Sequence, residues 1–381
     1  MSAPIIIIGS GFGSYQLIKT IRRTDKHLPI TVFTLDEGHD YNKPDLSHVF
    51  SNKQNSADLI RLSAQEFASE NNITLHAFTK VDCIDSVQQQ VFVNGVAYPY
   101  AKLVLATGAK TFVPPMLGNA TDSVITLNSL REFDSAQLQL QNAQTVLVIG
   151  AGIIGTEIAM DLNHSGKIVV VVDPSHGVMA SMLPELVASA LQKKMVNMGV
   201  VFEFGRTISS LNKTELGICA TLSSGQTYTV DCVISAAGLK ANVGLARQSG
   251  CKVNKGLVVN NQLQTSVNNI YALGDCAEIN GKVMSYLQPI LLSANALAKT
   301  LLGQPTDLKL PAMLVKVKTP HMPIQLGGNT VTDVASWQVD IDALGCSVKA
   351  YNEQKQIIGF VVTEGHMNNT FALLRALPAS L

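Results

Sequence analysis

Residues 5–13 read IIIIGSGFG, and this stretch decides the fold of the chain. Four apolar β-branched residues in a row are typical of a short strand buried on both faces, as strands of parallel sheets are. Gly9 and Gly11 follow, and because they lack a Cβ they let the backbone turn tightly and approach a ligand. A helix over residues 13–23 would then begin with unpaired N–H groups that favour a phosphate. Ser14 replaces the third glycine of the usual fingerprint.

An acid follows the next predicted strand. Residues 30–35 are mostly apolar and end at Asp36, where a carboxylate binds the ribose hydroxyls of a dinucleotide. The first fifty residues therefore predict a dinucleotide site. An ordinary turn between parallel strands accounts for the same pattern and remains the alternative.

A second and complete fingerprint lies in residues 145–173, TVLVIGAGIIGTEIAMDLNHSGKIVVVVD. Gly150, Gly152 and Gly155 stand at G-x-G-x-x-G spacing between an apolar strand and a predicted helix over residues 153–163. The next strand ends at Asp173, 18 residues after the last glycine, close to the roughly 20 residues of the motif. This stretch predicts a dinucleotide site by itself.

Asp173 also bears on which dinucleotide binds. A carboxylate here accepts hydrogen bonds from both hydroxyls of the adenosine ribose and repels a 2′-phosphate. No arginine follows it, because the next residues are Pro174, Ser175 and His176. The sequence therefore predicts NADH rather than NADPH.

The composition is that of a globular protein. The chain has 381 residues, 46% of them hydrophobic and 15% charged, with 28 basic and 28 acidic side chains. This length allows two or three domains, and the zero net charge argues against general nucleic-acid binding. No apolar run approaches the roughly 18 residues of a membrane span and no signal segment is recognisable, so we expect a cytoplasmic protein.

The cysteines do not pair in sequence. None of the six forms a C-x-x-C motif, which argues against a zinc knuckle and a thioredoxin-like redox pair, and no metal site is predicted. They are best explained as small buried hydrophobic residues in a reduced compartment. They are Cys83, Cys219, Cys232, Cys251, Cys276 and Cys346.

Small residues also follow three other predicted strands, over residues 103–106, 232–236 and 270–273. At the carboxyl edge of a parallel sheet such residues leave room for a ligand. They are Thr107-Gly108, Ala237-Gly238 and Gly274-Asp275. Over residues 58–71, apolar and polar residues alternate near the helical period, which is typical of a helix. Pro114-Pro115 marks a domain crossing.

Lysines near two of these segments are ambiguous. Lys43 precedes Pro44 in a polar loop, and Lys316 and Lys318 share one side of a predicted strand over residues 313–318. From the residues alone, ordinary solvated side chains explain all three best. Further strands are predicted over residues 335–339, 347–351 and 357–363, with a last helix over 371–377.

These patterns predict an α/β chain with two Rossmann-like dinucleotide-binding domains and a small C-terminal α+β domain. The expected boundaries are residues 1–112 with 241–308, then 113–240, then 309–381. Two dinucleotides in one chain indicate FAD with a nicotinamide dinucleotide, because hydride passes from one ring to the other. No P-loop and no Ser-His-Asp order competes with this interpretation.

The chain resembles the FAD-dependent pyridine-nucleotide oxidoreductases of the rubredoxin and ferredoxin reductase branch. The resemblance is carried, in family order and over nearly the whole chain, by IIIIGSGFG, YNKPDLS, LVLATGA, VLVIGAGIIGTE, VISAAGL, IYALGDCAEI and VKVKTP. The longer strings YNKPDLSHVFS, ALGDCAEING and LKLPAMLVKVKTP make the match specific. The resemblance implies that residues 1–112 with 241–308 bind FAD and that residues 113–240 bind NAD.

The resemblance also implies catalytic roles for three residues. Lys43 and Lys318 match two lysines beside the flavin ring, where positive charge stabilises the anionic reduced flavin. Glu157 matches an acid near the nicotinamide and is expected to pair with Lys43. This competes with the solvated-lysine interpretation.

Cofactor-binding positions are implied in the same way. Asp36 takes the FAD ribose, with Glu37 as a second candidate, and the backbone of Val81 meets the adenine. Asp275 matches the acid that holds the ribityl chain. The other implied cofactor-binding positions are Gly9, Gly11, Gly13, Ser14, Thr107, Gly108, Gly150, Gly152, Gly155, Asp173, Gly238 and Gly274.

The missing cysteines then decide between branches of the family. Disulfide reductases of this fold have a cysteine pair beside the flavin, and NADH peroxidases and oxidases have one cysteine in the stretch that is YNKPDLSHV here. Electrons are therefore expected to leave singly to an external carrier. The resemblance implies a transient partner, the rubredoxin domain of a flavorubredoxin that reduces nitric oxide. A redox-sensing NADH-binding protein and the ferredoxin reductase of an oxygenase are the alternatives.

Overall fold

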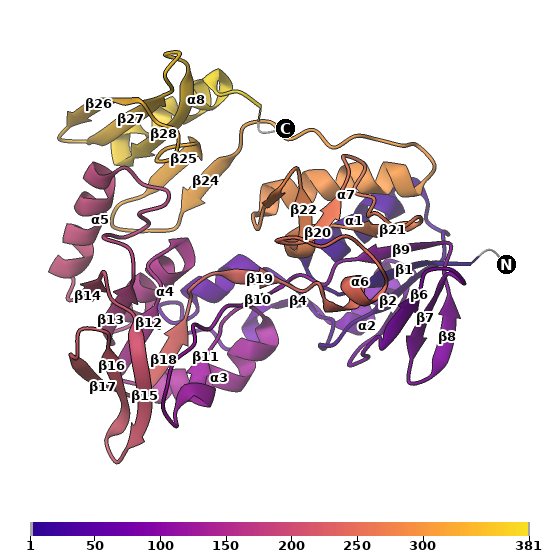
Figure 1. Ribbon diagram of the computed structural model, residues 1–381, viewed down its shortest axis with the longest axis horizontal. Helices are drawn as coiled ribbons and strands as arrows, with labels where there is room; N and C mark the ends of the chain where they lie inside the picture. The colour runs from indigo at the N-terminus through magenta and orange to yellow at the C-terminus, as the bar shows by residue number, and fades with distance from the viewer. Residues whose placement is uncertain (1–2, 380–381) are drawn as a thin grey trace.

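The computed structural model describes residues 3–379. Two parallel sheets lie side by side, and a third, antiparallel sheet from the end of the chain sits over one of them (Figure 1). This architecture confirms the predicted α/β class with two Rossmann-like units and a C-terminal α+β unit. No helix in the described residues has the length and apolar character needed to span a bilayer.

The first parallel sheet is built around the strand that opens the chain. The four residues of β1 are all buried, because β2 and β9 pair on its two sides and other layers cover both faces. The strand order is β21-β9-β1-β2-β5. The strands are β1 (Ile5–Ile8), β2 (Ile30–Phe33), β5 (Thr74–His76), β9 (Lys102–Leu105) and β21 (Ile270–Ala272). Helices α1 (Phe12–Thr24) and α7 (Leu287–Leu301) pack against each other beside this sheet.

The second parallel sheet is built on the second fingerprint. Its order is β11-β18-β12-β13-β14, so that β12 lies in the centre between β18 and β13. Its strands are β11 (Val124–Ile125), β12 (Thr145–Ile149), β13 (Ile168–Asp173), β14 (Val201–Phe204) and β18 (Cys232–Ser235). The associated helices are α3 (Leu130–Asn142), α4 (Ile153–His164) and α5 (Glu185–Asn197).

The two faces of this second sheet have different coverings. Val146 and Val148 of β12 pack with α3, α4 and α5, whereas Leu147 and Ile149 pack under a three-stranded antiparallel sheet. That cover is β15 (Ile208–Thr214), β16 (Gly217–Leu222) and β17 (Thr227–Val230). Alternate residues of one strand therefore enter different cores, because successive side chains of a strand point to opposite faces of the sheet.

A two-stranded ribbon joins the two parallel sheets. Strands β10 (Ala109–Thr111) and β19 (Leu239–Ala241) pair antiparallel, so the chain leaves one sheet and returns to it at the same place. Three smaller sheets flank the first sheet. They are β3 (Asp40–Tyr41) with β4 (Ile60–Leu62); β6 (Cys83–Asp85), β7 (Gln90–Val93) and β8 (Val96–Pro99); and β20 (Leu257–Val259), β22 (Ala277–Ile279) and β23 (Lys282–Val283).

The C-terminal sheet has the order β24-β25-β28-β27-β26. One face adds Val317, Ile324 and Val361 to the core under α4, and the other face packs against α8 (Thr370–Ala376). The strands are β24 (Leu314–Val317), β25 (Ile324–Gly328), β26 (Ser336–Asp342), β27 (Gly345–Tyr351) and β28 (Ile357–Thr363). This unit therefore shares a core with the second sheet.

Short helices complete the fold. They are α2 (Ala64–Glu70), α6 (Gly244–Gln248) and the 3-10 helices η1 (Lys43–His48), η2 (Ala57–Leu59), η3 (Thr121–Ser123), η4 (Gly274–Cys276) and η5 (Glu364–Asn369). Only α2 and η2, with the strand β4 between them, occupy the region predicted as one helix over residues 58–71. The capping box of Ser63 and Glu66 begins the helix late, because these side chains satisfy its first N–H groups. Strands β15 and β25 were not predicted.

Candidate functional site: a two-dinucleotide cavity

One cavity of about 2360 Å³ extends across both parallel sheets and the C-terminal unit. Both glycine-rich loops, the strand ends of the first sheet and β24 contribute to its lining. Of the predicted site residues, all but Gly155 and the second ribose candidate Glu37 line it. Residues that are hundreds of positions apart in the sequence therefore meet at one site.

The first glycine loop forms a cradle at the start of α1. Gly9 has φ +112°, and a Cβ built on it would lie 2.2 Å from the carbonyl oxygen of Ala106. Gly11 is the N-cap of α1 and has no side chain to cap the helix, and a Cβ there would enter open space. The first N–H groups of α1 are therefore left for an anion at the cavity.

Gly13 and Ser14 of this loop have another function. A Cβ on Gly13 would lie 3.2 Å from Ile290 of α7, so glycine here permits close packing of the two helices. Ser14 is fully buried, and its hydroxyl has no hydrogen-bond partner within residues 3–379. The serine therefore fits the helix–strand contact, and its hydroxyl is left for a group bound in the cavity.

The second glycine loop repeats the first. Gly150 has φ +107°, with a built Cβ 2.6 Å from the carbonyl oxygen of Ala236, and Gly152 is the uncapped N-cap of α4, facing open space. A Cβ on Gly155 would lie 1.9 Å from the carbonyl oxygen of Gly150. Gly155 is therefore required by helix–loop packing, which explains why it lies behind the cavity wall.

Hydrogen bonds from neighbouring residues orient the carboxylate of Asp36 at the cavity. Its Oδ1 accepts hydrogen bonds from Ser10 Oγ (2.6 Å), Thr34 Oγ1 (2.6 Å) and the Gly38 N–H (3.1 Å). Its Oδ2 has no partner within the described part of the chain, and Asp36 lines the cavity, whereas Glu37 does not. The geometry favours Asp36 over Glu37 for binding ribose hydroxyls.

Asp173 is held in a similar way at the second loop. Its Oδ2 accepts from the Ala151 N–H at 2.6 Å and its Oδ1 from the Ser175 N–H at 2.7 Å. The carboxylate is therefore fixed beside the helix N-terminus. Each oxygen keeps a lone pair for a ribose hydroxyl.

We expect kcat/KM for NADH to exceed that for NADPH, and Asp173→Ala to weaken NADH recognition by about 1.5–3 kcal/mol, since two charged hydrogen bonds to ribose are lost. Steady-state kinetics with both dinucleotides measure this. Equal values for the two dinucleotides in the wild-type chain would contradict it.

Lys43 pairs with an acid other than the expected one. Its Nζ lies 3.5 Å from Oδ2 of Asp275, which follows β21. The expected pair of Lys43 with Glu157 is therefore wrong. The reason is the direction of η1: Lys43 begins this helix facing the first sheet, and Ser47 and His48, one turn later, face α4.

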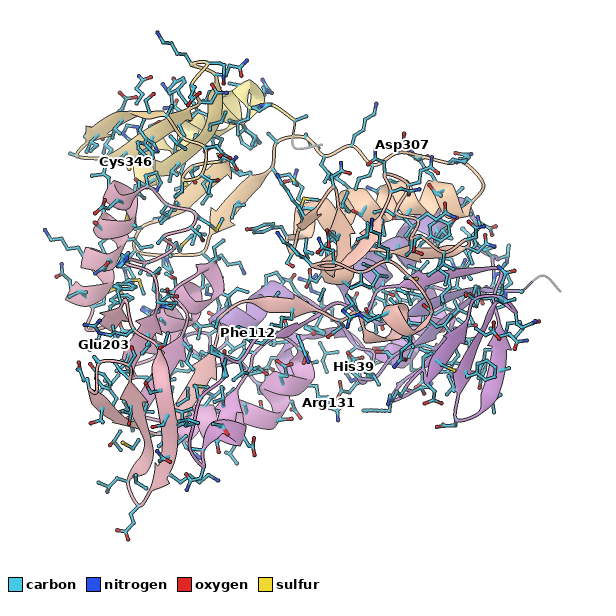
Figure 2. The ribbon with its side chains drawn as sticks, in the orientation of Figure 1. His39, Phe112, Arg131, Glu203, Asp307 and Cys346 are labelled. Carbon is cyan, nitrogen blue, oxygen red and sulfur yellow. The ribbon has the colours of Figure 1, made fainter. Side chains whose placement is uncertain are left out.

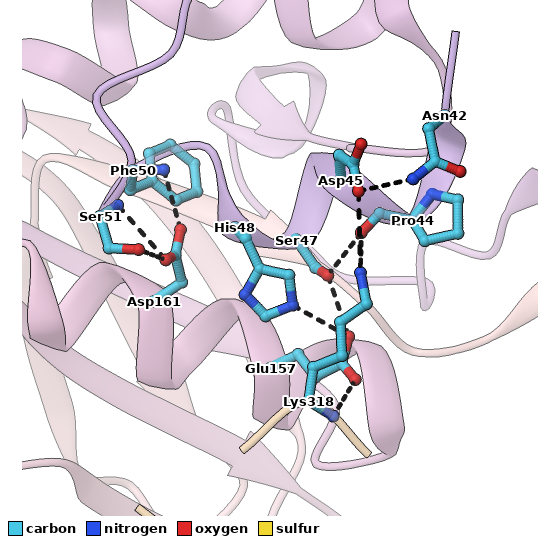
Figure 3. Close-up of polar contacts among 10 residues, drawn as sticks. All are labelled: Asn42, Pro44, Asp45, Ser47, His48, Phe50, Ser51, Glu157, Asp161 and Lys318. Atoms are coloured by element: carbon cyan, nitrogen blue, oxygen red, sulfur yellow. Dashed lines mark hydrogen bonds and ion pairs between the residues drawn. The ribbon is translucent and has the colours of Figure 1, made fainter. Parts of the chain in front are cut away.

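Glu157 joins three parts of the chain (Figure 3). Its Oε2 accepts from Ser47 Oγ at 2.9 Å and lies 4.0 Å from His48 Nε2, and its Oε1 accepts from the backbone N–H of Lys318 at 2.8 Å. The side chain of Lys318 reaches back to the carbonyl oxygen of Pro44 at 3.0 Å. Lys318 therefore contacts the residue that follows Lys43, and both lysines line the cavity.

Asp161, one helical turn beyond Glu157, binds the same region. Its carboxylate accepts from the Phe50 N–H at 2.8 Å, the Ser51 N–H at 3.3 Å and the Ser51 hydroxyl. Only 7% of Glu157 and 5% of Asp161 are exposed. In the sequence, the signal for this contact is a pair of acids at i and i+4 of an otherwise apolar helix.

The remaining predicted positions lie at turns. Gly108, Gly238 and Gly274 have positive φ angles, and a Cβ on any of them would enter open space. Thr107 Oγ1 donates to the carbonyl oxygen of Asn242 at 2.7 Å. This bond joins the segment before β10 to the segment after β19. Val81 is buried and lines the cavity.

Sequence reasoning missed several cationic and aromatic residues of the cavity wall. Phe112 lies beside the joining ribbon, and Arg131 lies nearby on α3 (Figure 2). Lys240 Nζ stands 4.0 Å from the centre of the Phe112 ring. The missed wall residues are Lys110, Phe112, Arg131, Arg206, Lys282 and Tyr286. Nothing in their local sequence distinguishes them from solvated residues.

None of the six cysteines lines the cavity within residues 3–379. Cys276, beside Asp275, is fully buried and its thiol donates to the carbonyl oxygens of Leu105 and Leu273. Burial raises the pKa of the Cys276 thiol, and raises that of Cys232 to about 12. Cys346 lies in the C-terminal sheet (Figure 2). Within the described part of the chain, no thiol is therefore exposed to the cavity.

We expect N-ethylmaleimide to label the exposed Cys83 and to leave NADH-dependent turnover unchanged, because the thiols with raised pKa stay protonated and enclosed. Mass spectrometry identifies the labelled cysteine, and the turnover of treated and untreated protein is compared. Loss of turnover in step with labelling would contradict a thiol-free electron path.

Known proteins match the whole chain. The pyridine nucleotide-disulphide oxidoreductase family matches residues 3–295, and the rubredoxin binding C-terminal domain matches residues 307–377. The chain therefore belongs to the pyridine nucleotide-disulphide oxidoreductase family, and its fold and two-dinucleotide cavity are those of that class.

Within this family it is similar to proteins of one kind. The nitric oxide reductase FlRd-NAD(+) reductase of Aliivibrio fischeri is 55% identical over 99% of this chain and 99% of its own length. The protein of that name from Vibrio vulnificus is 50% identical over 99% of this chain and 98% of its own. The crystal structure of a ferredoxin reductase from Rhodopseudomonas palustris has the same fold, with a TM-score of 0.89 at 23% identity, covering 99% and 96% of the two chains. These findings confirm the resemblance drawn from the sequence.

Proposed function

We propose that this protein is an NADH-dependent flavorubredoxin reductase that carries FAD. The single observation that carries the proposal is the cavity, in which both glycine cradles and a strand of the rubredoxin-binding unit meet and to which no cysteine of residues 3–379 contributes. Full-length relatives with this name support it. The electron acceptor is the rubredoxin domain of a flavorubredoxin that reduces nitric oxide.

The residues of the chain fit both dinucleotides. The N-terminus of α1 and Asp36 would hold the diphosphate and ribose of FAD, with Asp275 available to its ribityl chain. The N-terminus of α4 and Asp173 would hold the same groups of NADH. Each helix begins with an uncapped glycine that faces open space, which is what an anion at a helix N-terminus requires.

FAD, when bound, accepts two electrons together as hydride and releases them one at a time. The chain provides the surroundings for this chemistry. Lys43 and Lys318 bring positive charge to the cavity, where it stabilises negative charge that develops on reduction. Glu157 fixes η1 and β24 against α4, so that the two lysines keep their positions relative to the NADH site.

The position of Lys318 links the cavity to the acceptor. This residue follows β24 within the rubredoxin-binding unit, and it contacts Pro44 beside the FAD cradle. The unit that binds the carrier therefore also contributes to the wall of the cavity.

The domain division predicted from the sequence stays a proposal: residues 1–112 with 241–308 for FAD, 113–240 for NAD and 309–381 for the partner. The pairing of β10 with β19 supports this division, because the chain passes from the first parallel sheet to the second at β10 and returns at β19. We also propose a cytoplasmic location, because NADH and reduced thiols belong to that compartment.

The test uses the purified full-length chain. We expect a yellow protein that releases FAD on denaturation and reduces a rubredoxin domain rapidly with NADH. A stand-alone rubredoxin and a ferredoxin serve as competing acceptors in the same assay. A colourless protein would contradict the flavin, and slow turnover with a persistent charge-transfer band would favour a redox sensor. Faster reduction of the ferredoxin would favour an oxygenase reductase.

A further inference from the structure

An arginine lies beside Asp173 although none follows it in the sequence. Strand β14 pairs parallel with β13, and Phe204 is in register with Asp173. Gly205 then turns the chain with φ +65°, and its N–H donates to the carbonyl oxygen of Ser175 at 2.8 Å. Arg206 therefore comes next at the carboxyl edge of the sheet, where parallel strands bind ligands.

The side chain of Arg206 makes few contacts with the rest of the described chain. Its backbone N–H donates to the carbonyl oxygen of Asp173 at 3.3 Å, and its Nη1 contacts only the carbonyl oxygen of the preceding glycine, at 3.3 Å. Within residues 3–379 no acid forms an ion pair with it, and it lines the cavity with Asp173. Arg22, by contrast, is bound by four backbone carbonyl groups.

The carboxylate of Asp173, by contrast, is held by hydrogen bonds. Both of its oxygens accept backbone N–H groups, so the carboxylate cannot turn toward the guanidinium without losing these hydrogen bonds. One end of the cavity therefore presents a fixed anion and, on the residue whose backbone N–H binds the Asp173 carbonyl oxygen, an exposed cation without an acidic partner in residues 3–379. A fixed anion selects ribose hydroxyls, and an unpaired guanidinium matches a phosphate in bidentate geometry.

We propose that Arg206 is a specificity-determining residue of the dinucleotide site, a latent 2′-phosphate ligand whose use Asp173 prevents. The inference rests on the proposed NADH site. It means that the preference for NADH comes from repulsion by Asp173 and not from the absence of a phosphate-binding cation. Removing the carboxylate alone then converts the site.

Binding of ADP-ribose and 2′-phospho-ADP-ribose, measured by calorimetry, tests this without any turnover. The proteins are the wild-type chain, Asp173→Ser, Arg206→Gln and the double variant. We expect the wild-type chain to prefer ADP-ribose. Asp173→Ser should strengthen 2′-phospho-ADP-ribose binding, and adding Arg206→Gln should then weaken it by about ten- to a hundredfold, the range of a charge-assisted hydrogen bond. Asp173→Asn replaces Asp173→Ser if that variant does not fold.

The matched control is Lys213→Gln, which removes the same charge from exposed β15 outside the cavity. Combined with Asp173→Ser, it should leave 2′-phospho-ADP-ribose binding unchanged. The proposal is overturned if Arg206→Gln weakens both ligands equally, or if Lys213→Gln acts as strongly. If the wild-type chain binds neither ligand, the proposed function fails as well, whereas loss of the Arg206 effect alone leaves that function intact.

Discussion

Gly9→Ala is expected to give a colourless protein. The alanine must adopt φ +112°, and its Cβ would lie 2.2 Å from the carbonyl oxygen of Ala106, at the junction of β1, β9 and α1. The backbone strain alone costs about 1–3 kcal/mol. The clash moves the loop away from the helix N-terminus, so the anion site is lost. The absorbance of bound flavin per protein chain measures the effect.

Two other glycines make the result interpretable. Gly225→Ala, in the hairpin between β16 and β17, has φ +88° with open space around the new methyl group, so it carries backbone strain alone and should stay yellow. Gly11→Ala has neither strain nor clash, and its methyl group enters the cradle. We expect FAD to bind this variant at least about tenfold more weakly, a loss of roughly 1.4 kcal/mol. Unchanged FAD affinity in Gly11→Ala would place the flavin elsewhere.

Lys318→Ala should slow electron delivery by about ten- to a hundredfold, since it removes one prepositioned positive charge from the site of reduction. The variant keeps the backbone N–H that binds Glu157, so β24 stays anchored. The Lys318 side chain is 41% exposed, so we expect a stability loss below about 1 kcal/mol. Stopped-flow kinetics of acceptor reduction and the thermal midpoint separate the two effects.

The flavin potential gives a second measure of Lys318. We expect it to fall by about 30 mV for each 1.4 kcal/mol of lost stabilisation of the reduced form. Lys318→Arg should restore much of the rate, and Lys355→Ala, an exposed lysine of the same unit outside the cavity, should have little effect. If Lys318→Ala changes neither the rate nor the potential, the solvated-lysine interpretation is correct.

The parts of the site that were predicted are those with a local cause. A buried strand, a glycine turn and a helix lie within about 20 consecutive residues. Every glycine of the two fingerprints except Gly13, which packs against α7, is needed by the turn, the adjacent strand or the start of the helix. Gly9 and Gly150 show this, since both have positive φ and both lie against the carbonyl of a neighbouring strand. Such constraints are visible in one stretch of sequence.

The pairing of charges could not be predicted in the same way. Lys43 and Asp275 are 232 residues apart and meet because β21 joins the sheet beside β9. Glu157 lies at the cavity, but its side chain binds Ser47 and not Lys43, because the direction of η1 turns Ser47 toward it. Strand β25 escaped prediction because its sequence, IQLGG, alternates over only three residues and ends in two glycines.

By itself, the sequence determined the α/β class, the two dinucleotide cradles, the NADH-type acid and the lack of a C-x-x-C pair, because each depends on residues close together in the chain. Only the tertiary structure decided that the two cradles open into one cavity, that Lys318 and Glu157 join the partner-binding unit to it, and that Arg206 stands beside Asp173. These depend on which strands lie side by side, and that is decided by the packing of the buried faces across the whole molecule.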